Sequence, residues 1–201
     1  MTNIKTTLLA VGLLLTLSGN AQPTEATTHY RNFPILIKLQ FHNLAMPFRD
    51  IKANFSNIGI GLGTEVSYNG KSNWVQQVTT TWHHNKSVGN SIMLYSQAAW
   101  RPNISAGFYT ELKAGAGYKY AFRPVESFQQ MDGSWQSVQH KGKGMLVVPL
   151  GFSVGYQAPS VKTYVSPFIS YQFLLVSGYN TSIPLLPETL IQVGSRIHLN
   201  R

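Results

Sequence analysis

Residues 105–122 read SAGFYTELKAGAGYKYAF, and this stretch decides the fold class. Its even positions are mostly apolar, whereas its odd positions are mostly small or charged. Successive side chains of a β-strand point to opposite faces, so the alternation predicts a strand with one apolar face. A helix would scatter the same residues around its whole circumference.

The same alternation recurs along most of the chain. The further segments that carry it are residues 34–42, 57–68, 73–84, 91–101, 145–157, 161–177 and 189–199. Together with residues 105–122 they make eight strands, which is an even number. The pattern is least regular in residues 73–84 and 91–101, so the faces of these two strands stay open.

The connectors alternate in length. Tight turns fall at Asn69 and Gly70, at Pro102 and at Pro159, and longer connectors lie between them. The longer connectors cover residues 43–56, 85–90, 123–144 and 178–187. Short turns on the periplasmic side and long loops outside the cell are typical of outer-membrane barrels. We therefore predict an all-β fold, a closed eight-stranded antiparallel up-and-down transmembrane β-barrel over residues 34–201.

The composition agrees with a membrane barrel and excludes other classes. Charged residues make up 11% of the 201-residue chain, against about 25% in soluble domains. Hydrophobic residues make up 43%, but the mean hydropathy of −0.07 shows that they are interleaved with polar ones, which excludes a bundle of membrane helices. The net charge of +9 comes from scattered basic residues, so we expect no nucleic acid as a partner. The absence of cysteine excludes disulfides and thiolate metal sites.

The N-terminus predicts export. Lys5 precedes an apolar run over residues 8–17, and Gly19 and Ala21 supply the small residues of a cleavage site. We predict a cleaved signal peptide over residues 1–21, a short periplasmic tail over residues 22–33, and location in the cell outer membrane.

The face opposite the large apolar residues carries charges that would point into the lumen. These residues are Lys38, Glu65, Glu111, Lys113, Lys119 and Arg196. An eight-stranded barrel has an interior just wide enough for side chains to fill it. We therefore predict a paired charge network that plugs the barrel, with a formal charge of +2 from four cations and two carboxylates.

Aromatic residues on the apolar face predict two girdles at the membrane surfaces. Trp74 and Trp82 lie eight residues apart, which is about 26 Å along a strand and about 20 Å along the membrane normal. The predicted girdle residues are Trp74, Trp82, Trp100, Tyr118, Tyr120, Tyr156 and Tyr171.

At this point the chain resembles the small eight-stranded outer-membrane β-barrel proteins of Gram-negative bacteria. Residues 20–22, 55–57, 61–65 and 115–118 are similar to those of uncharacterised Bacteroidota members. The resemblance covers about residues 33–201 and implies the barrel fold without an assigned activity. Such barrels usually end on an aromatic residue, whereas Leu199 and two polar residues end this chain.

The sequence carries no clear catalytic set. Lipid A-modifying barrels use a histidine base near a serine and a carboxylate at the outer membrane edge. His83, His84, Ser87 and Ser91 lie close together in sequence, but no carboxylate accompanies them. Neighbouring residues of a strand face opposite sides, so the two histidines cannot hold one metal ion. We predict histidines with a loop or girdle role, no catalytic residue, no metal site and no cofactor.

The loops are the predicted contact surface. Residues 123–144 indicate a hairpin that extends beyond the membrane and is mildly basic. The candidate contact residues of the loops are Phe48, Arg49, Phe128, Trp135, Lys141 and Lys143. The expected partners are outer-membrane lipid, the phosphates of lipopolysaccharide and a larger outer-membrane protein complex.

We therefore predict a non-catalytic protein that acts as a structural or accessory subunit of an envelope assembly, through its lipid-facing surface and its extracellular loops. Two alternatives stay open within the barrel fold, a lipid A-modifying enzyme and a narrow pore. A soluble exported sandwich or lipocalin-like barrel is the alternative to the membrane barrel itself.

Overall fold

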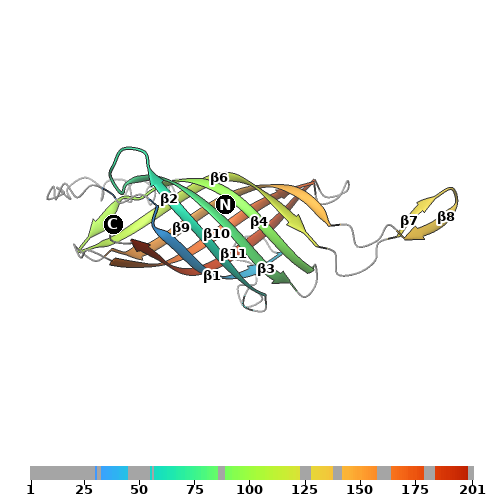
Figure 1. Ribbon diagram of the computed structural model, residues 1–201, viewed down its shortest axis with the longest axis horizontal. Coiled ribbons are helices and arrows are strands. Elements are labelled where there is room, and N and C mark those ends of the chain that lie inside the picture. The colour runs from blue at the N-terminus through green and yellow to red at the C-terminus, as the bar shows by residue number, and fades with distance from the viewer. Residues whose placement is uncertain are drawn as a thin grey trace, which may run out of the picture.

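The chain folds into one barrel with a projecting hairpin (Figure 1). The structure is a computed structural model and describes residues 30, 33–44, 55, 57–85, 89–122, 128–137, 142–157, 164–178 and 184–198. The strands are β1 (Ile35–Asn43), β2 (Ile58–Ser67), β3 (Trp74–Asn85), β4 (Gly89–Trp100), β5 (Asn103–Ser105), β6 (Phe108–Ala121), β7 (Phe128–Met131), β8 (Ser134–Ser137), β9 (Lys143–Tyr156), β10 (Tyr164–Ser177) and β11 (Leu185–His198). No helix in these ranges is long and apolar enough to cross a membrane.

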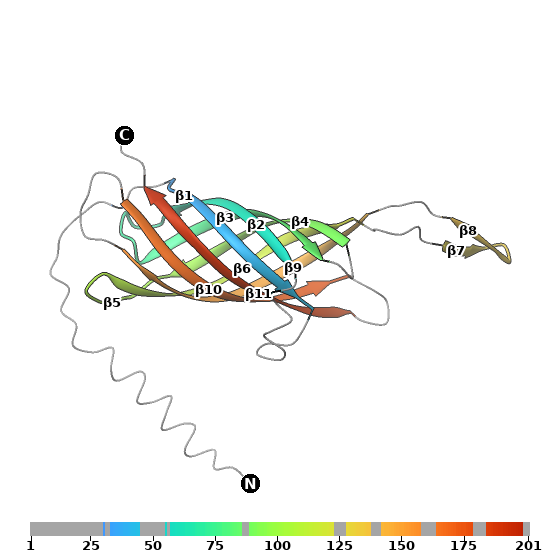
Figure 2. The ribbon, with the colours of Figure 1, turned by 90° about the horizontal axis from the view of Figure 1, so that it is seen from below.

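The eight long strands form a closed ring. Their order is β4-β3-β2-β1-β11-β10-β9-β6, and β6 pairs back with β4. All the pairings are antiparallel, including the pairing of β1 with β11 that joins the first and last strands. Figure 2 shows these two strands side by side along the barrel. The predicted closed eight-stranded antiparallel barrel is confirmed.

The two ends of the barrel differ. The turns from β2 to β3 and from β4 to β6 lie at one end, together with the end of β9, the start of β10, the start of β1 and the end of β11. We call this the turn end. The opposite end, which we call the loop end, holds the ends of β1, β3, β6 and β10 and the starts of β2, β4, β9 and β11.

One turn differs from its predicted position. Instead of reversing around Pro102, the chain adds the short strand β5 and reverses at Ala106 and Gly107, which have φ values of +50° and +86°. Two successive residues with positive φ are the signature of the two-residue turn that matches strand twist, and glycine adopts this conformation without a steric penalty. The strand predicted from residue 105 therefore begins at Phe108.

The hairpin of β7 and β8 lies beyond the loop end (Figure 1). Its two strands are joined by Asp132 and Gly133, with φ values of +52° and +79°. An Asp-Gly pair between two short strands is a strong signal for such a turn. The hairpin lies within the segment for which the sequence predicts one.

Side chains alternate between the membrane-facing wall and the lumen. Large apolar residues such as Leu62, Val78 and Leu112 are exposed on the wall, and the residues between them are buried inside. The structure also answers the question left open for β3 and β4, because Trp74, Trp82 and Trp100 all lie on the outside.

The lumen contains an apolar core as well as polar residues. The residues of this core are Met93, Tyr95, Met145, Val147, Leu174, Val176 and Leu190. Small residues on β2 make room for side chains of its neighbours. A Cβ atom at Gly59 would lie 2.6 Å from the Cβ of His83 and 2.6 Å from the Trp82 carbonyl oxygen. The sequence indicated the small residues but not the apolar core.

Candidate functional site

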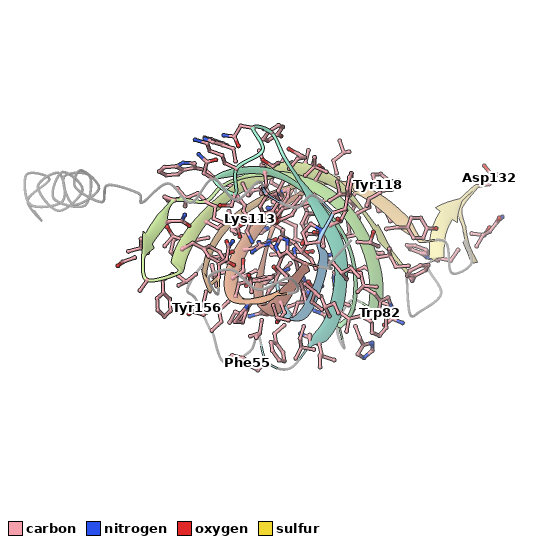
Figure 3. The ribbon with its side chains drawn as sticks, turned by 60° about the vertical axis from the view of Figure 1, so that its left-hand side comes forward. Phe55, Trp82, Lys113, Tyr118, Asp132 and Tyr156 are labelled. Carbon is pink, nitrogen blue, oxygen red and sulfur yellow. The ribbon has the colours of Figure 1, made fainter. Side chains whose placement is uncertain are left out.

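The polar lumen brings together side chains from all parts of the chain. Each of the six charged residues predicted to face inward is at most 4% exposed. Two more buried charges, Arg101 and Glu188, join them. The lumen thus holds five buried Lys or Arg residues and three buried carboxylates within the described ranges, a formal charge of +2. Figure 3 shows Lys113 inside the barrel.

Two arginines and two carboxylates form an ion cluster at the turn end. Arg101 Nη2 lies 2.9 Å from Glu65 Oε2 and 2.7 Å from Glu111 Oε1. Arg196 Nε lies 2.7 Å from Glu65 Oε1, and its Nη2 lies 3.2 Å from Glu111 Oε1. Lys113 is at the edge of the group, with Nζ 3.7 Å from Glu111 Oε2. We call these five residues the turn-end cluster.

Tyr30, which precedes β1, is buried against the turn-end cluster. Its phenol donates a hydrogen bond to Glu65, and its backbone N–H donates to the Gly70 carbonyl at 2.8 Å. Burial raises the pKa of the Tyr30 phenol well above its ordinary value, and the Glu65 carboxylate raises it further. The phenol therefore stays protonated and keeps its role as a donor. Tyr30 belongs to the predicted tail of residues 22–33, whereas the predicted signal peptide lies outside the described residues.

The middle of the lumen is bridged by single hydrogen bonds. Lys38 Nζ donates to Thr79 Oγ1 at 3.1 Å. Gln172 Nε2 donates to Gln97 Oε1 at 3.3 Å, from β10 to β4 across the barrel. Lys38 therefore stands apart from the turn-end cluster, although the sequence grouped all six charges into one network.

A second group of polar residues lies at the loop end. Lys119 Nζ lies 2.6 Å from Glu188 Oε1 and 2.7 Å from Oε2. His42 Nε2 lies 3.0 Å from Glu188 Oε2, and the rings of His42 and His83 pack with their centroids 4.5 Å apart. Ser91 Oγ lies 2.6 Å from His83 Nε2. We call these five residues the loop-end cluster.

The structure corrects the prediction for His83. The sequence predicted a loop or girdle role, but His83 is 1% exposed and faces the lumen. Its neighbour His84 points outward and pairs with the Asn90 side chain. A carboxylate does lie in the same cluster, Glu188 of β11, but its histidine contact is with His42. Glu188 is separated from the inward Arg196 and His198 by an even number of positions along the strand, and this parity would have predicted that Glu188 also points inward.

Most of the predicted girdle residues lie near strand ends on the outer wall. Trp74 faces Trp100 across β3 and β4 at the turn end, with ring centroids 6.4 Å apart. Trp82, Tyr118 and Tyr120 lie toward the loop end, and Tyr156 ends β9 at the turn end. Figure 3 shows Trp82, Tyr118 and Tyr156 pointing away from the lumen. Tyr171 lies at the middle of β10 instead, away from both strand ends.

The predicted loop contacts are described only in part. Trp135 lies on β8 and is 70% exposed, and Lys143 is the first residue of β9. Phe128 is the first residue of β7. The other candidates, Phe48, Arg49 and Lys141, lie outside the described residues.

The outer wall carries a shallow hollow of about 650 Å³ on the face of β3, β4, β6, β9 and β10. Two small residues paired across neighbouring strands, Ala98 and Ala114, are among the residues that line it. The aromatic residues that line it are Trp74, Trp100, Phe152, Tyr171 and Phe173. Close by, Gln76 Nε2 donates a hydrogen bond to Ser96 Oγ on the outer face.

Comparison with solved structures identifies the fold. The crystal structure of Neisserial surface protein A (NspA) aligns with a TM-score of 0.54 and 13% identity, over 83% of this chain and 97% of NspA. The chain has the fold of the small outer-membrane β-barrels. Ail, the attachment invasion locus protein of Yersinia pestis, aligns with a TM-score of 0.45 and 14% identity, over 83% of this chain and 97% of Ail.

At these identities the likeness concerns the fold alone. No family model matches the chain, and no curated protein matches it. The resemblance to Bacteroidota proteins stays a prediction.

Proposed function

We propose that this protein is a non-catalytic barrel of the outer membrane that acts as a structural or accessory subunit of an envelope assembly. The observation that carries the proposal is the filled lumen. Side chains from facing strands meet at the turn end, in the middle and at the loop end, with Arg196, Gln172 and Lys119 each reaching across. A barrel filled in this way acts through its outer wall and its loops.

The hollow on the outer wall supports a membrane-embedded protein as the partner. Within a bilayer, small residues let two proteins approach closely, and polar side chains form hydrogen bonds between them. Ala98 and Ala114 provide the small residues, and the neighbouring Gln76–Ser96 pair provides polar groups on a wall that is mostly apolar. The exposed Trp135 and the basic Lys143 are the corresponding candidates for lipopolysaccharide contact at the loop end.

The test is affinity purification of the tagged protein from outer membranes in mild detergent. Ala98→Phe fills the hollow without touching the lumen, and we expect it to remove a partner that co-purifies in stoichiometric amount with the wild type. Thr80→Phe is the matched control, because Thr80 is exposed on the same wall but does not line the hollow. It should retain the partner.

Two results contradict the accessory role through this wall. One is that the wild-type protein is purified without a partner, even when the membranes are chemically cross-linked before they are dissolved in detergent. The other is a partner that Ala98→Phe retains in full while the barrel stays folded.

A lipid A-modifying enzyme is the second candidate, and the contact between Ser91 and His83 favours it. A serine at 2.6 Å from an imidazole nitrogen is the arrangement of a nucleophile and its base. However, Glu188 contacts His42 and not His83, so the base lacks the carboxylate that orients it in a catalytic triad. Lipid A mass spectra of a deletion strain test this candidate. If the protein modifies lipid A, the deletion changes the spectrum, and complementation with the wild type restores it whereas complementation with Ser91→Ala does not.

A further inference from the structure

Three potential metal ligands converge in the loop-end cluster. One donor atom from each of His42, His83 and Glu188 lies within 4.8 Å of the other two. All three side chains are buried in the lumen, and they come from β1, β3 and β11. Two donors on a tetrahedral zinc ion lie about 3.3 Å apart, given bond lengths of about 2.0–2.1 Å. Small rotations of these side chains therefore bring the three donors to bonding distance.

The free nitrogen of His83 is an independent sign of a ligand. Nδ1 of His83 makes no hydrogen bond among the described residues, although the side chain is 1% exposed. A buried polar atom without a partner costs about 1–3 kcal/mol. The other ring nitrogen is held by Ser91 at 2.6 Å. When Nε2–H donates to the Ser91 hydroxyl, the lone pair of His83 sits on Nδ1.

His42 likewise has one ring nitrogen directed to the site and the other held by a neighbouring side chain. Its Nε2 points to Glu188, and its Nδ1 lies 3.1 Å from the side-chain amide of Asn85. Amide oxygen and nitrogen exchange places by a simple flip, so the Asn85 oxygen can accept a hydrogen bond from Nδ1–H. Metal-binding histidines usually carry such a partner on the nitrogen that does not bind the metal. Both histidines of this cluster have one.

We propose that His42, His83 and Glu188 form a binding site for a divalent transition-metal ion of the zinc class. Two imidazole nitrogens and one carboxylate oxygen make up the protein ligands of open four-coordinate zinc sites, which leave one position for water or another ligand. Calcium and magnesium select sites built of oxygen ligands, so this donor set disfavours them.

Lys119 tunes the site. Its ammonium group contacts both oxygens of Glu188. A metal ion takes Oε2, next to His42, and Lys119 keeps Oε1. Because the ammonium repels the metal ion and competes for the carboxylate, Lys119 holds the affinity below that of the three ligands alone. The site also links β1 and β11, the pair that closes the barrel, to β3.

The test is titration of the folded protein, purified from outer membranes without a polyhistidine tag, with ZnCl₂ in a calorimeter. Addition of CoCl₂ gives a second readout, because Co²⁺ on two imidazoles and a carboxylate absorbs visible light. We expect one Zn²⁺ per barrel for the wild type. His83→Gln loses this binding, and Ser91→Ala weakens it about 10–100-fold through the second ring nitrogen. Lys119→Met tightens it.

His84→Gln is the matched control, since His84 is on the same strand but points to the outer wall. It keeps the wild-type affinity and the cobalt spectrum. The proposal is overturned if the wild type binds no Zn²⁺, or if His83→Gln binds as the wild type does. If His83→Gln migrates as an unfolded protein on an unheated gel, the Zn²⁺ affinity of Lys119→Met is the deciding measurement. Weaker binding by Lys119→Met than by the wild type then overturns the proposal.

Discussion

Glu111→Gln is the sharpest test of the turn-end cluster. The cluster holds three cations, Arg101, Lys113 and Arg196, against two carboxylates, Glu65 and Glu111, and so carries a formal charge of +1. Replacing Glu111 with its neutral isostere raises this charge to +2 in a poorly solvated interior. A second substitution, Lys113→Met, would instead remove one cation and make the cluster neutral. The two substitutions therefore have unequal effects on the free energy of unfolding.

The magnitude follows from the hydrogen bonds of Glu111. Its Oε1 accepts from Arg101 Nε at 3.0 Å, Arg101 Nη2 at 2.7 Å, Gln77 Nε2 at 2.9 Å and Arg196 Nη2 at 3.2 Å. Glutamine keeps one acceptor oxygen but loses the charge that these cations need. Removing one partner of a buried ion pair costs about 3–5 kcal/mol, and we expect Glu111→Gln to lower the free energy of unfolding by this amount.

Lys113→Met is the matched control inside the same cluster. Lys113 Nζ lies 3.7 Å from Glu111 and donates one hydrogen bond to Ser170 Oγ at 3.1 Å. The Ser170 hydroxyl also donates to the Phe152 carbonyl and so keeps a partner after the substitution. The expected cost is about 1 kcal/mol, the net contribution of an ordinary hydrogen bond.

The assay is equilibrium unfolding in urea of the protein folded into lipid vesicles, with free energies from linear extrapolation. The temperature at which an unheated gel band shifts to the unfolded position gives an independent ranking. A cost below about 1 kcal/mol for Glu111→Gln, which is typical of exposed ion pairs, would refute the reasoning. So would a larger cost for Lys113→Met than for Glu111→Gln.

Three further outcomes are expected. Gly59→Ala destabilises the barrel by about 1–3 kcal/mol, because its Cβ would meet the Trp82 carbonyl oxygen at 2.6 Å. Gly61→Ala costs less in the same urea titration, because its nearest contacts are side-chain atoms at longer distances, Thr81 Cγ2 at 3.1 Å and Lys38 Cβ at 3.4 Å. Tyr30→Phe costs about 1–3 kcal/mol, since Glu65 loses a buried donor, and an unchanged unfolding midpoint would show that Tyr30 does not close the turn end. Planar bilayer recordings of the wild type give no stepwise conductance, and regular single-channel steps would favour the pore alternative over a filled lumen.

The sequence predicts the barrel well because a membrane barrel repeats one pattern. Every strand must present an apolar side chain at each second position, and the alternation therefore reports strand and face together. Arg101 and Glu188 were not predicted as lumen residues, although Arg101 directly follows β4 and Glu188 lies within β11. Residues 91–101 were given no inward positions of their own, and the last strand was predicted from residue 189, one residue after Glu188. The outward positions of Trp100 and Ile92 already imply that Arg101 points inward. Extending the last strand by one residue places Glu188 inside as well.

The loop-end cluster was harder to predict because it depends on the stagger of strands around the ring. Parity places His42 on the inner face, and it places His83 there only once the structure has fixed the faces of β3. The height of a residue in the lumen depends in addition on the register of each pairing. His42 faces Leu190 of β11, and Glu188 lies two residues further along that strand. The relative height of His83 and Glu188 depends on three successive strand pairings, β3 with β2, β2 with β1 and β1 with β11. No local pattern in the sequence specifies the combined stagger of these pairings.

The buried charges also specify how the last strand closes the ring. A slip of β11 by one residue would turn its apolar face inward, which the hydrophobic pattern forbids. A slip by two residues keeps the faces and is the closest competing arrangement. It moves Arg196 and Glu188 by about 7 Å along the strand, whereas their contacts with Glu111 and Lys119 are 3.2 Å and 2.6 Å long. Each cluster would lose the ion pairs that it makes with β11, those of Arg196 at the turn end and those of Glu188 at the loop end. The register of β11 is therefore selected at both ends of the lumen.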